Sequence, residues 1–348
     1  MRRALLFLKG GLGDVAFALP LVADLRAGWP GVELWVLTHA QGKGVLDLCP
    51  DVAHTLSYGA VSAEPTMRTL LDALRGQRFD AALTPVRSPR AAWLLWKSQA
   101  GMRVGFGGGP EALLYTHRAP VRPFEVTFSR RFERLAAVAG LPALGRPAPL
   151  RVSPERRERA REQLLSAGWD GEAPLISIHV GGGWPTKQWP VEHAAALAAL
   201  FARRHGLVSL LIGGEADRER AEAVALASGG AGLVQVGNAV DESLAQLDLC
   251  TAAVGLDSGL SHAGAALGVP TVSLFGPNDP ASIVLAPHQR LLVQGGLPCR
   301  PCNRLGKLRC PLGHHRCMRD TTAAQVLSAL EPLLALGELR LRAQPQPP

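Results

Sequence analysis

Short apolar runs alternate with helical patterns along nearly the whole chain, and this rhythm restricts the fold more than any other feature. The runs typical of buried strands are residues 4–8, 32–37, 79–83, 175–179, 208–212, 232–236, 252–256 and 271–275. Helical patterns follow several of them, beginning near Val15, Gln41 and Pro89. Strands that alternate with helices form parallel sheets covered by helices, so the sequence predicts an α/β fold.

The rhythm is interrupted around residues 141–154, where proline and glycine are frequent and no period is visible. A chain of 348 residues is also too long for one ordinary core. We therefore expect two doubly wound, Rossmann-like domains, residues 1–150 and 151–320, that face one cleft. Residues 321–348 are expected to form a helix that packs back across the domain boundary and then a frayed tail.

The composition limits the partners and the compartment. A net charge of +8 favours an acidic partner, such as a phosphorylated glycolipid, a nucleotide or nucleic acid. Aromatic residues make up only 5% of the chain, and it lacks RNA-recognition sequences and zinc-finger spacings, so nucleic acid is the weaker option. Lys9 and Asp14 interrupt the first apolar run, and no stretch reaches the roughly 18 apolar residues of a membrane span. We expect a cytoplasmic protein.

A glycine-rich turn with Gly11, Gly13 and Asp14 follows the first strand. Its glycines match the spacing of a dinucleotide-binding fingerprint. That fingerprint also needs an acidic residue near the end of the second strand, whereas the nearest acid, Glu33, stands at that strand's beginning. A nucleotide-dependent oxidoreductase is therefore the weaker interpretation. Asp14 begins the next helix as a functional carboxylate or as its N-cap.

A second glycine-rich loop, with Gly182, Gly183 and Lys187, follows the strand at residues 175–179. Backbone N–H groups and one lysine can bind phosphate, although the glycine spacing is not that of a P-loop. The alternative is a solvated lysine on a surface turn. Glu215 follows the next strand, where it either accepts hydrogen bonds from a ribose or favours a helix start.

Three polar residues and a glycine stand in one short turn between two apolar runs: Asp257, Ser258, Gly259 and His262. They fall at the carboxyl end of a strand and in the first turn of a helix, where backbone N–H groups favour anionic ligands. Open α/β sheets bind their ligands at this edge. The alternative is that Ser258 caps the helix and His262 is a satisfied surface histidine.

Four of the six cysteines are clustered in sequence: Cys299, Cys302, Cys310 and Cys317. In a cytoplasmic protein such a cluster favours metal binding over disulfides. The four thiolates could close a structural zinc site or, less readily, hold an iron–sulfur cluster. The alternative is a set of reduced thiols in a packed loop.

Taken together, these motifs resemble those of the heptosyltransferase family of glycosyltransferases, family 9. The resemblance covers nearly the whole chain and rests on Gly-Leu-Gly-Asp14, Lys187-Gln-Trp-Pro190, Gly-Gly-Glu215, Asp257-Ser-Gly-Leu-Ser-His262 and Leu-Phe-Gly-Pro277. It implies a GT-B fold whose second domain holds an ADP-activated sugar, foremost ADP-heptose. The first domain would hold an acidic glycolipid acceptor, such as the lipopolysaccharide inner core.

The resemblance also implies a role for each matching residue: Asp14 as general base, Lys187 as diphosphate ligand, Glu215 as ribose or base contact, and Asp257 with His262 as sugar and phosphate contacts. Many members carry hydroxyl side chains where this chain has Gly10, Gly11, Gly182 and Gly183, which leaves the sugar open. We expect an inverting glycosyltransferase that needs no metal for catalysis. The alternatives are transfer of another nucleotide sugar to a different envelope acceptor, and a nucleotide-sugar-binding or epimerase-type enzyme.

Basic and aromatic side chains of the first domain point to an acceptor at a membrane. The candidates for contacts with an acidic acceptor are Arg87, Arg90, Lys97 and Arg103. The candidates for a peripheral contact with the inner membrane surface are Trp93, Leu94 and Trp96. The alternative for both groups is a solvated face above a stripe of core residues.

Overall fold

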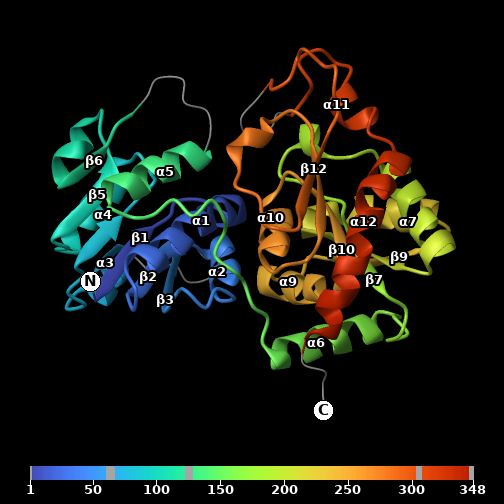
Figure 1. Ribbon diagram of the computed structural model, residues 1–348, viewed down its shortest axis with the longest axis horizontal. Coiled ribbons are helices and arrows are strands. Elements are labelled where there is room, and N and C mark those ends of the chain that lie inside the picture. Colours follow the sequence, from blue (N-terminus) through green and yellow to red (C-terminus); the bar gives the residue numbers. More distant parts are fainter. Residues whose placement is uncertain (1, 60–66, 122–127, 303–307, 345–348) are drawn as a thin grey trace. The chain divides into compact units, whose positions relative to one another are not determined.

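The computed structural model describes residues 2–59, 67–121, 128–302 and 308–344. The chain divides into two compact units. The first comprises Met1–Arg151 with Ala281–Val284, and the second comprises Val152–Pro280 with Leu285–Pro348. Each unit contains a parallel sheet, with six strands among the described residues, and helices pack against it (Figure 1). The predicted α/β class with two Rossmann-like sheets is confirmed.

The first unit alternates strands and helices in chain order. Its elements are β1 (Arg3–Phe7), α1 (Leu12–Gly28), β2 (Glu33–His39), α2 (Ala40–Leu46), β3 (His54–Tyr58), α3 (Met67–Leu74), β4 (Ala81–Leu83), α4 (Pro89–Lys97), β5 (Met102–Phe106), η1 (Pro110–Leu114), β6 (His117–Ala119) and α5 (Phe128–Val138). The strand order is β3-β2-β1-β4-β5-β6. This order reverses between β1 and β4, so their carboxyl ends form the switch point where such sheets bind ligands.

The central strand β1 is buried on both faces of its sheet. Leu5 and Phe7 pack in one cluster with Leu70 of α3 and Leu94 of α4. Leu6 points to the opposite face, as alternate residues of a strand do, and is equally buried. Burial on both faces explains why this strand is a continuous apolar run in the sequence.

The second unit repeats the same plan. Its elements are α6 (Pro154–Ser166), β7 (Leu175–His179), η2 (Pro185–Lys187), α7 (Val191–His205), β8 (Val208–Gly213), η3 (Glu215–Asp217), α8 (Arg218–Ala227), β9 (Gly232–Val236), α9 (Val240–Asp248), β10 (Cys250–Leu256), α10 (Gly259–Ala266), β11 (Thr271–Phe275), β12 (Gln289–Val293), α11 (Arg316–Arg319) and α12 (Ala323–Arg342). The short helix η4 (Pro280–Ser282) begins in the second unit at Pro280, and its other two residues belong to the first. The strand order is β12-β11-β10-β7-β8-β9, which places the switch point between β7 and β10.

Alternation along β7 decides which side chains enter the core and which reach the site. Ile176 and Ile178 join the large apolar cluster that α7 and α12 complete. Ser177 and His179 point to the opposite face, where they line a small internal cavity with residues of α9 and α10. The last residue of β7 is therefore a histidine directed toward α10.

The C-terminal helix α12 lies in the second unit, where it packs against α7 and β10 (Figure 1). Its buried face contributes Val326, Leu327, Leu330 and Leu333 to the core of that unit. Packing of this helix across the domain boundary stays a prediction. Of the expected tail, residues 345–348 lie outside the described part of the chain.

Four strands of the structure have no counterpart among the predicted runs: β3, β5, β6 and β12. Three of them lie at sheet edges, where one side of the strand meets solvent and polar residues are tolerated. Residues 122–127, which precede α5, lie outside the described ranges. Within these ranges, no helix is long and apolar enough to cross a membrane.

Candidate functional site

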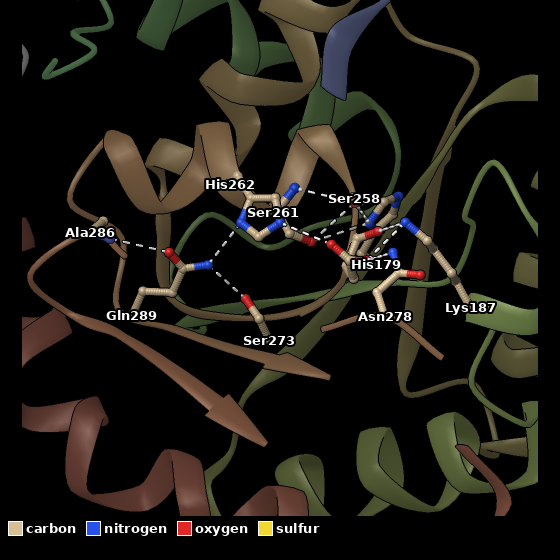
Figure 2. Close-up of polar contacts among 10 residues, drawn as sticks. His179, Lys187, Ser258, Ser261, His262, Ser273, Asn278, Ala286 and Gln289 are labelled. Carbon is tan, nitrogen blue, oxygen red and sulfur yellow. Dashed lines mark hydrogen bonds and ion pairs between the residues drawn. The ribbon is translucent and has the colours of Figure 1, made fainter. Parts of the chain in front are cut away.

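Lys187 and Asp257 form a buried ion pair at the carboxyl edge of the second sheet. The Lys187 Nζ lies 2.8 Å from Asp257 Oδ2 and also donates to the Asp257 carbonyl oxygen at 3.1 Å. The two side chains are 12% and 3% exposed. Asp257 directly follows β10 and Lys187, labelled in Figure 2, ends η2 in the loop after β7, so the pair joins the two loops of the switch point.

Two further side chains hold the Asp257 carboxylate. His262 Nε2 lies 3.4 Å from Oδ1, and the Asn278 amide donates to Oδ2. Burial by itself raises the pKa of Asp257, but the hydrogen bond from His262 and the charge on Lys187 bring it down to about 2. The carboxylate is therefore ionised at neutral pH. Asn278 was not predicted, and its Oδ1 is buried without a hydrogen-bond partner among the described residues.

Ser258 is the N-cap of α10, as the capping interpretation predicts. Its Oγ accepts a hydrogen bond from the Ser261 amide at 3.4 Å and lies 3.0 Å from His179 Nδ1. Burial lowers the pKa of His179 to about 4, so this imidazole is neutral at pH 7. His179 is a site residue that sequence reasoning missed, although its place as the last residue of a strand before a glycine-rich loop was visible.

The glycine-rich loop after β7 requires glycine at position 181, which is not among the predicted site residues. A Cβ on Gly181 would lie 1.8 Å from Asp217 Oδ2, whereas one on Gly182 would find its nearest atom at 3.6 Å and one on Gly183 would meet nothing within 4 Å. Asp217 Oδ2 also accepts from the Gly214 amide at 2.9 Å. Asp217, which sequence reasoning missed, therefore occupies the space that a side chain at position 181 would need.

Glu215 stands at the end of β8 with its side chain mostly exposed. Its two carboxylate oxygens accept from the Arg218 guanidinium at 2.6 and 2.7 Å. The hydrogen bond and charge of Arg218 lower the pKa of Glu215. The structure thus pairs this carboxylate with a neighbouring cation, and a contact with ribose stays a prediction.

Asp14 lies in the first turn of α1, at the switch point of the first sheet. The N-cap of that helix is Gly11, so Asp14 does not have the capping role that was the alternative. Gly10 has a φ of +134°, and a Cβ there would lie 1.6 Å from Asp14 Oδ2. Burial raises the pKa of Asp14, and the charge of Arg131 opposes this rise. A carboxyl group with a raised pKa is a better proton acceptor than an exposed one.

The glycines around Asp14 differ in what they permit. A Cβ on Gly11 would come within 2.7 Å of Gln41 Oε1, so a side chain there would displace the glutamine. A Cβ on Gly13 would meet only the Phe17 ring, at 4.0 Å. Close packing thus explains Gly11, while Gly13 stands in open surroundings.

A cavity of about 80 Å³ opens near Asp14 in the first unit. Its walls are Phe7, Lys9, Tyr58, Leu70, Ser88, Arg90 and Leu94. Burial raises the pKa of Tyr58, which Arg90 lowers and Asp14 raises, so the cavity lies within electrostatic range of both charges. An apolar interior with two cations suits an amphipathic anionic ligand.

The other basic and aromatic candidates of the first unit differ in their contacts and exposure. Arg103 donates to the backbone carbonyls of Leu114 and Ala100, which occupies its guanidinium. Lys97 Nζ lies 4.6 Å above the Trp96 ring, and Trp96 is 45% exposed. Leu94 is 1% exposed and belongs to the core, so the predicted contact of Leu94 with a membrane is wrong.

The structure does not support the predicted zinc site. In the described part of the chain, no group of three or more histidine, cysteine or acidic side chains lies close enough to hold a metal ion. Cys317 is packed in the core of the second unit, and burial raises the pKa of its thiol to about 11. Cys299 Sγ lies 3.9 Å from His314 Nε2, and all four cysteines, including Cys302 and Cys310, are free.

The cysteine-rich segment instead supports the loop that carries Lys187. His315 Nε2 lies 2.8 Å from the Thr186 carbonyl oxygen, to which it donates. The Trp189 indole donates to the Thr321 carbonyl oxygen at 2.8 Å. These contacts hold the residue before Lys187 and the residue two positions after it.

Comparison with known proteins identifies the family. Residues 67–310 match glycosyltransferase family 9 (heptosyltransferase). The chain belongs to this family. Lipopolysaccharide heptosyltransferase 1 of Pseudomonas aeruginosa is 30% identical to it over 86% of each chain. Lipopolysaccharide heptosyltransferase 2 of Salmonella typhimurium is 25% identical over 93% of this chain and 96% of its own.

Solved structures confirm the fold of this family 9 glycosyltransferase. The ADP-heptose lipopolysaccharide heptosyltransferase II of E. coli superposes with a TM-score of 0.78 at 23% identity, over 97% of this chain and 100% of its own. The E. coli heptosyltransferase WaaC with ADP-2-deoxy-2-fluoro heptose gives 0.67 at 19% identity, over 95% and 99%. The expected GT-B fold is thus confirmed, as is membership of the glycosyltransferases.

Proposed function

We propose that this glycosyltransferase moves heptose from ADP-heptose to an acidic glycolipid acceptor of the lipopolysaccharide inner core, with inversion and without a catalytic metal. The names of the two relatives and the ADP-heptose analogue in one solved relative support this donor and acceptor. The observation that carries the proposal is the buried Lys187–Asp257 pair at the switch point of the second sheet.

The donor diphosphate would bind between this pair and the start of α10. Lys187 supplies a full positive charge, and the first N–H groups of a helix have no intrahelical partners. Asp257 holds the lysine in place and keeps its own contacts with His262 and Asn278. The site therefore offers a positioned cation beside backbone donors, which suits a nucleoside diphosphate.

The transfer step then needs one base and one stabilised leaving group. Asp14 accepts the proton of the acceptor hydroxyl while that oxygen bonds to the anomeric carbon. The bond from this carbon to the diphosphate oxygen breaks, and ADP leaves with its charge stabilised by Lys187. Attack from the face opposite the leaving ADP inverts the anomeric centre. The raised pKa of Asp14 supports its role as the base.

The cavity beside Asp14 supports an acidic acceptor. Lys9 and Arg90 stand on its wall, and the remaining surface is mostly apolar. A sugar acid or phosphate could meet the two cations while an apolar part of the acceptor packs below them. For a glycolipid acceptor, the protein would work at the cytoplasmic face of the inner membrane, with the exposed Trp96 as a surface contact.

A direct transfer assay tests the proposal. Purified protein is incubated with ADP-heptose and with acceptors that either lack heptose or carry one heptose, and the products are weighed by mass spectrometry. We expect one acceptor to gain one heptose with release of ADP, and the anomeric configuration read by NMR to be inverted. ADP-glucose is the matched donor control. Transfer from ADP-glucose alone would overturn the assigned donor, and conversion of ADP-heptose without any acceptor product would favour an epimerase-type enzyme.

A further inference from the structure

Gln289 is a buried residue, 4% exposed, at the start of β12, an edge strand that the sequence did not reveal. We propose that Gln289 is a positioning residue that holds His262 as the neutral Nε2–H tautomer, so that the ring donates to Asp257 without competing with Lys187 for its charge. The importance of this tautomer for the donor site rests on the proposed function.

The orientation of the Gln289 amide follows from a backbone contact. The Ala286 amide nitrogen lies 3.3 Å from Gln289 Oε1. A backbone N–H can only donate, so the atom that faces it must be the side-chain oxygen. The opposite end of the amide is therefore the NH2 group, which can only donate.

That NH2 group decides the state of the imidazole. Gln289 Nε2 lies 2.9 Å from Ser273 Oγ and 3.1 Å from His262 Nδ1 (Figure 2). Because the amide nitrogen donates, His262 Nδ1 must offer a lone pair. The ring proton then sits on Nε2, which lies 3.4 Å from Asp257 Oδ1 and donates to it.

The surroundings of the ring make this restraint necessary. A carboxylate beside a histidine favours the charged imidazolium. The titratable groups that face this part of the site are Asp257 after β10, Lys187 after β7 and His179 at the end of β7. The strands β11 and β12 contribute Phe275, Ser273 and Gln289, none of which carries a charge. The amide of Gln289 opposes a second proton on the ring through its contact with Nδ1, and the positive charge of Lys187 on the same carboxylate also disfavours an imidazolium.

A proton on Nδ1 would point at another donor. It would face the Gln289 NH2 group, and turning the amide over would set that NH2 against the Ala286 N–H instead. Either arrangement leaves two buried donors opposed, which is unfavourable. An imidazolium would also draw the Asp257 carboxylate away from Lys187, which would loosen the lysine that is proposed to bind the diphosphate.

The test reads the tautomer directly. The protein is labelled with 15N-histidine, and long-range 1H–15N spectra at pH 7 report which ring nitrogens carry protons. The His262 signals are assigned by their loss in His262→Gln. We expect wild-type His262 to be neutral with its proton on Nε2. In Gln289→Glu the new carboxylate accepts from Nδ1–H, so the ring should be doubly protonated. In Gln289→Met the ring should no longer show a single proton fixed on Nε2.

A second buried glutamine provides the matched control. Gln246 on α9 bonds to Gln163 and Asn238, away from His262, so Gln246→Met should leave the His262 signals unchanged. A wild-type ring protonated on Nδ1, alone or together with Nε2, would overturn the proposal. So would an unchanged ring in folded Gln289→Glu or Gln289→Met. If Gln289→Glu does not fold, the wild-type and Gln289→Met spectra decide. No substrate is present, so failure of this inference is distinguishable from failure of the proposed transfer.

Discussion

At the residue scale, the donor site depends on two opposite charges that stabilise each other away from water. Asp257 is almost fully buried and ionised, so it needs the positive charge of Lys187 nearby. The same lysine is the cation proposed to meet the donor diphosphate. Its contribution to the fold and its contribution to binding must therefore be measured separately.

Replacing Lys187 with methionine should affect both properties, and a second change should separate them. Lys187→Met leaves a buried carboxylate without its cation, so the free energy of unfolding should fall by up to about 3 to 5 kcal/mol. ADP affinity should fall roughly tenfold to a hundredfold, since a charge-assisted contact contributes about 1.5 to 3 kcal/mol. Adding Asp257→Asn should restore stability but not ADP affinity. Urea unfolding and calorimetry measure the two effects.

The control for this series is Lys97→Met, which removes a lysine that lies over Trp96 in the other unit. It should leave ADP affinity unchanged. Unaltered ADP affinity in Lys187→Met would remove this lysine from the donor site.

Asp14→Asn tests the general base while keeping the size of the side chain. Turnover should fall by about 10² to 10⁴, the usual contribution of a positioned base, and ADP affinity should survive. Since burial raises the pKa of Asp14, its charged form costs stability above that pKa, and the neutral asparagine should leave the melting temperature at pH 7 unchanged or higher. Wild-type turnover should fall as the pH drops through this raised pKa, at a higher pH than for an exposed carboxyl.

Asp47→Asn is the matched control, because Asp47 is an exposed residue at the C-terminal end of α2 that pairs with Lys43. It should change neither turnover nor its pH profile. If Asp14→Asn transferred sugar at nearly the parent rate, the base would be another residue. If it unfolded, the role of Asp14 would be structural.

At the scale of elements, the cysteine-rich segment and α11 serve as a support for the short helix η2. The contact from His315 to the Thr186 carbonyl oxygen lies one residue before Lys187. This gives the segment a structural role that the spacing of its cysteines did not suggest.

His315→Ala should therefore weaken ADP binding, although His315 itself is not proposed to contact ADP. The net contribution of a hydrogen bond is about 0.5 to 1.5 kcal/mol, which corresponds to about a two- to tenfold loss of affinity. His205→Ala, which removes a pairing with Glu331, is the control and should bind ADP normally. Calorimetry on both variants makes the comparison. Full ADP affinity in a destabilised His315→Ala protein would show that the segment does not position Lys187.

At the scale of the whole molecule, each unit has its own sheet, its own core and its own switch point. The donor residues lie in the second unit and Asp14 lies in the first. Binding of a nucleotide in the absence of an acceptor should therefore stabilise mainly the second unit.

Hydrogen exchange with and without ADP tests this division. Protection should rise in peptides that cover residues 179–190 and 256–264, and much less in those that cover residues 9–14. ADP at a hundred times its Kd should add about 2.7 kcal/mol to the stability of the state that binds it. Adenosine, which lacks the diphosphate, should protect residues 179–190 less. Equal protection of residues 9–14 by ADP would contradict the assignment of the donor site.

The sequence alone identified the central strands, since β1, β7 and β10 are buried along nearly their whole length and are therefore rich in apolar residues. Edge strands such as β3, β6 and β12 were not predicted, because their solvent-facing sides carry polar residues. Local motifs also placed Lys187, Asp257 and His262 at strand ends before helices. The sequence is sufficient for this, because the order of strand, loop and helix is set by residues that are neighbours in the chain.

Contacts between distant segments were decided only by the tertiary structure. Lys187 and Asp257 are 70 residues apart, and their ion pair exists because β7 and β10 lie side by side in the sheet. Gln289 reaches His262 from an edge strand that has no strong apolar pattern. The cysteines are close in sequence, yet Cys317 packs into the core instead of a metal site. Spacing along a chain sets which side chains start near one another, but packing of the sheet and helices decides where each one points.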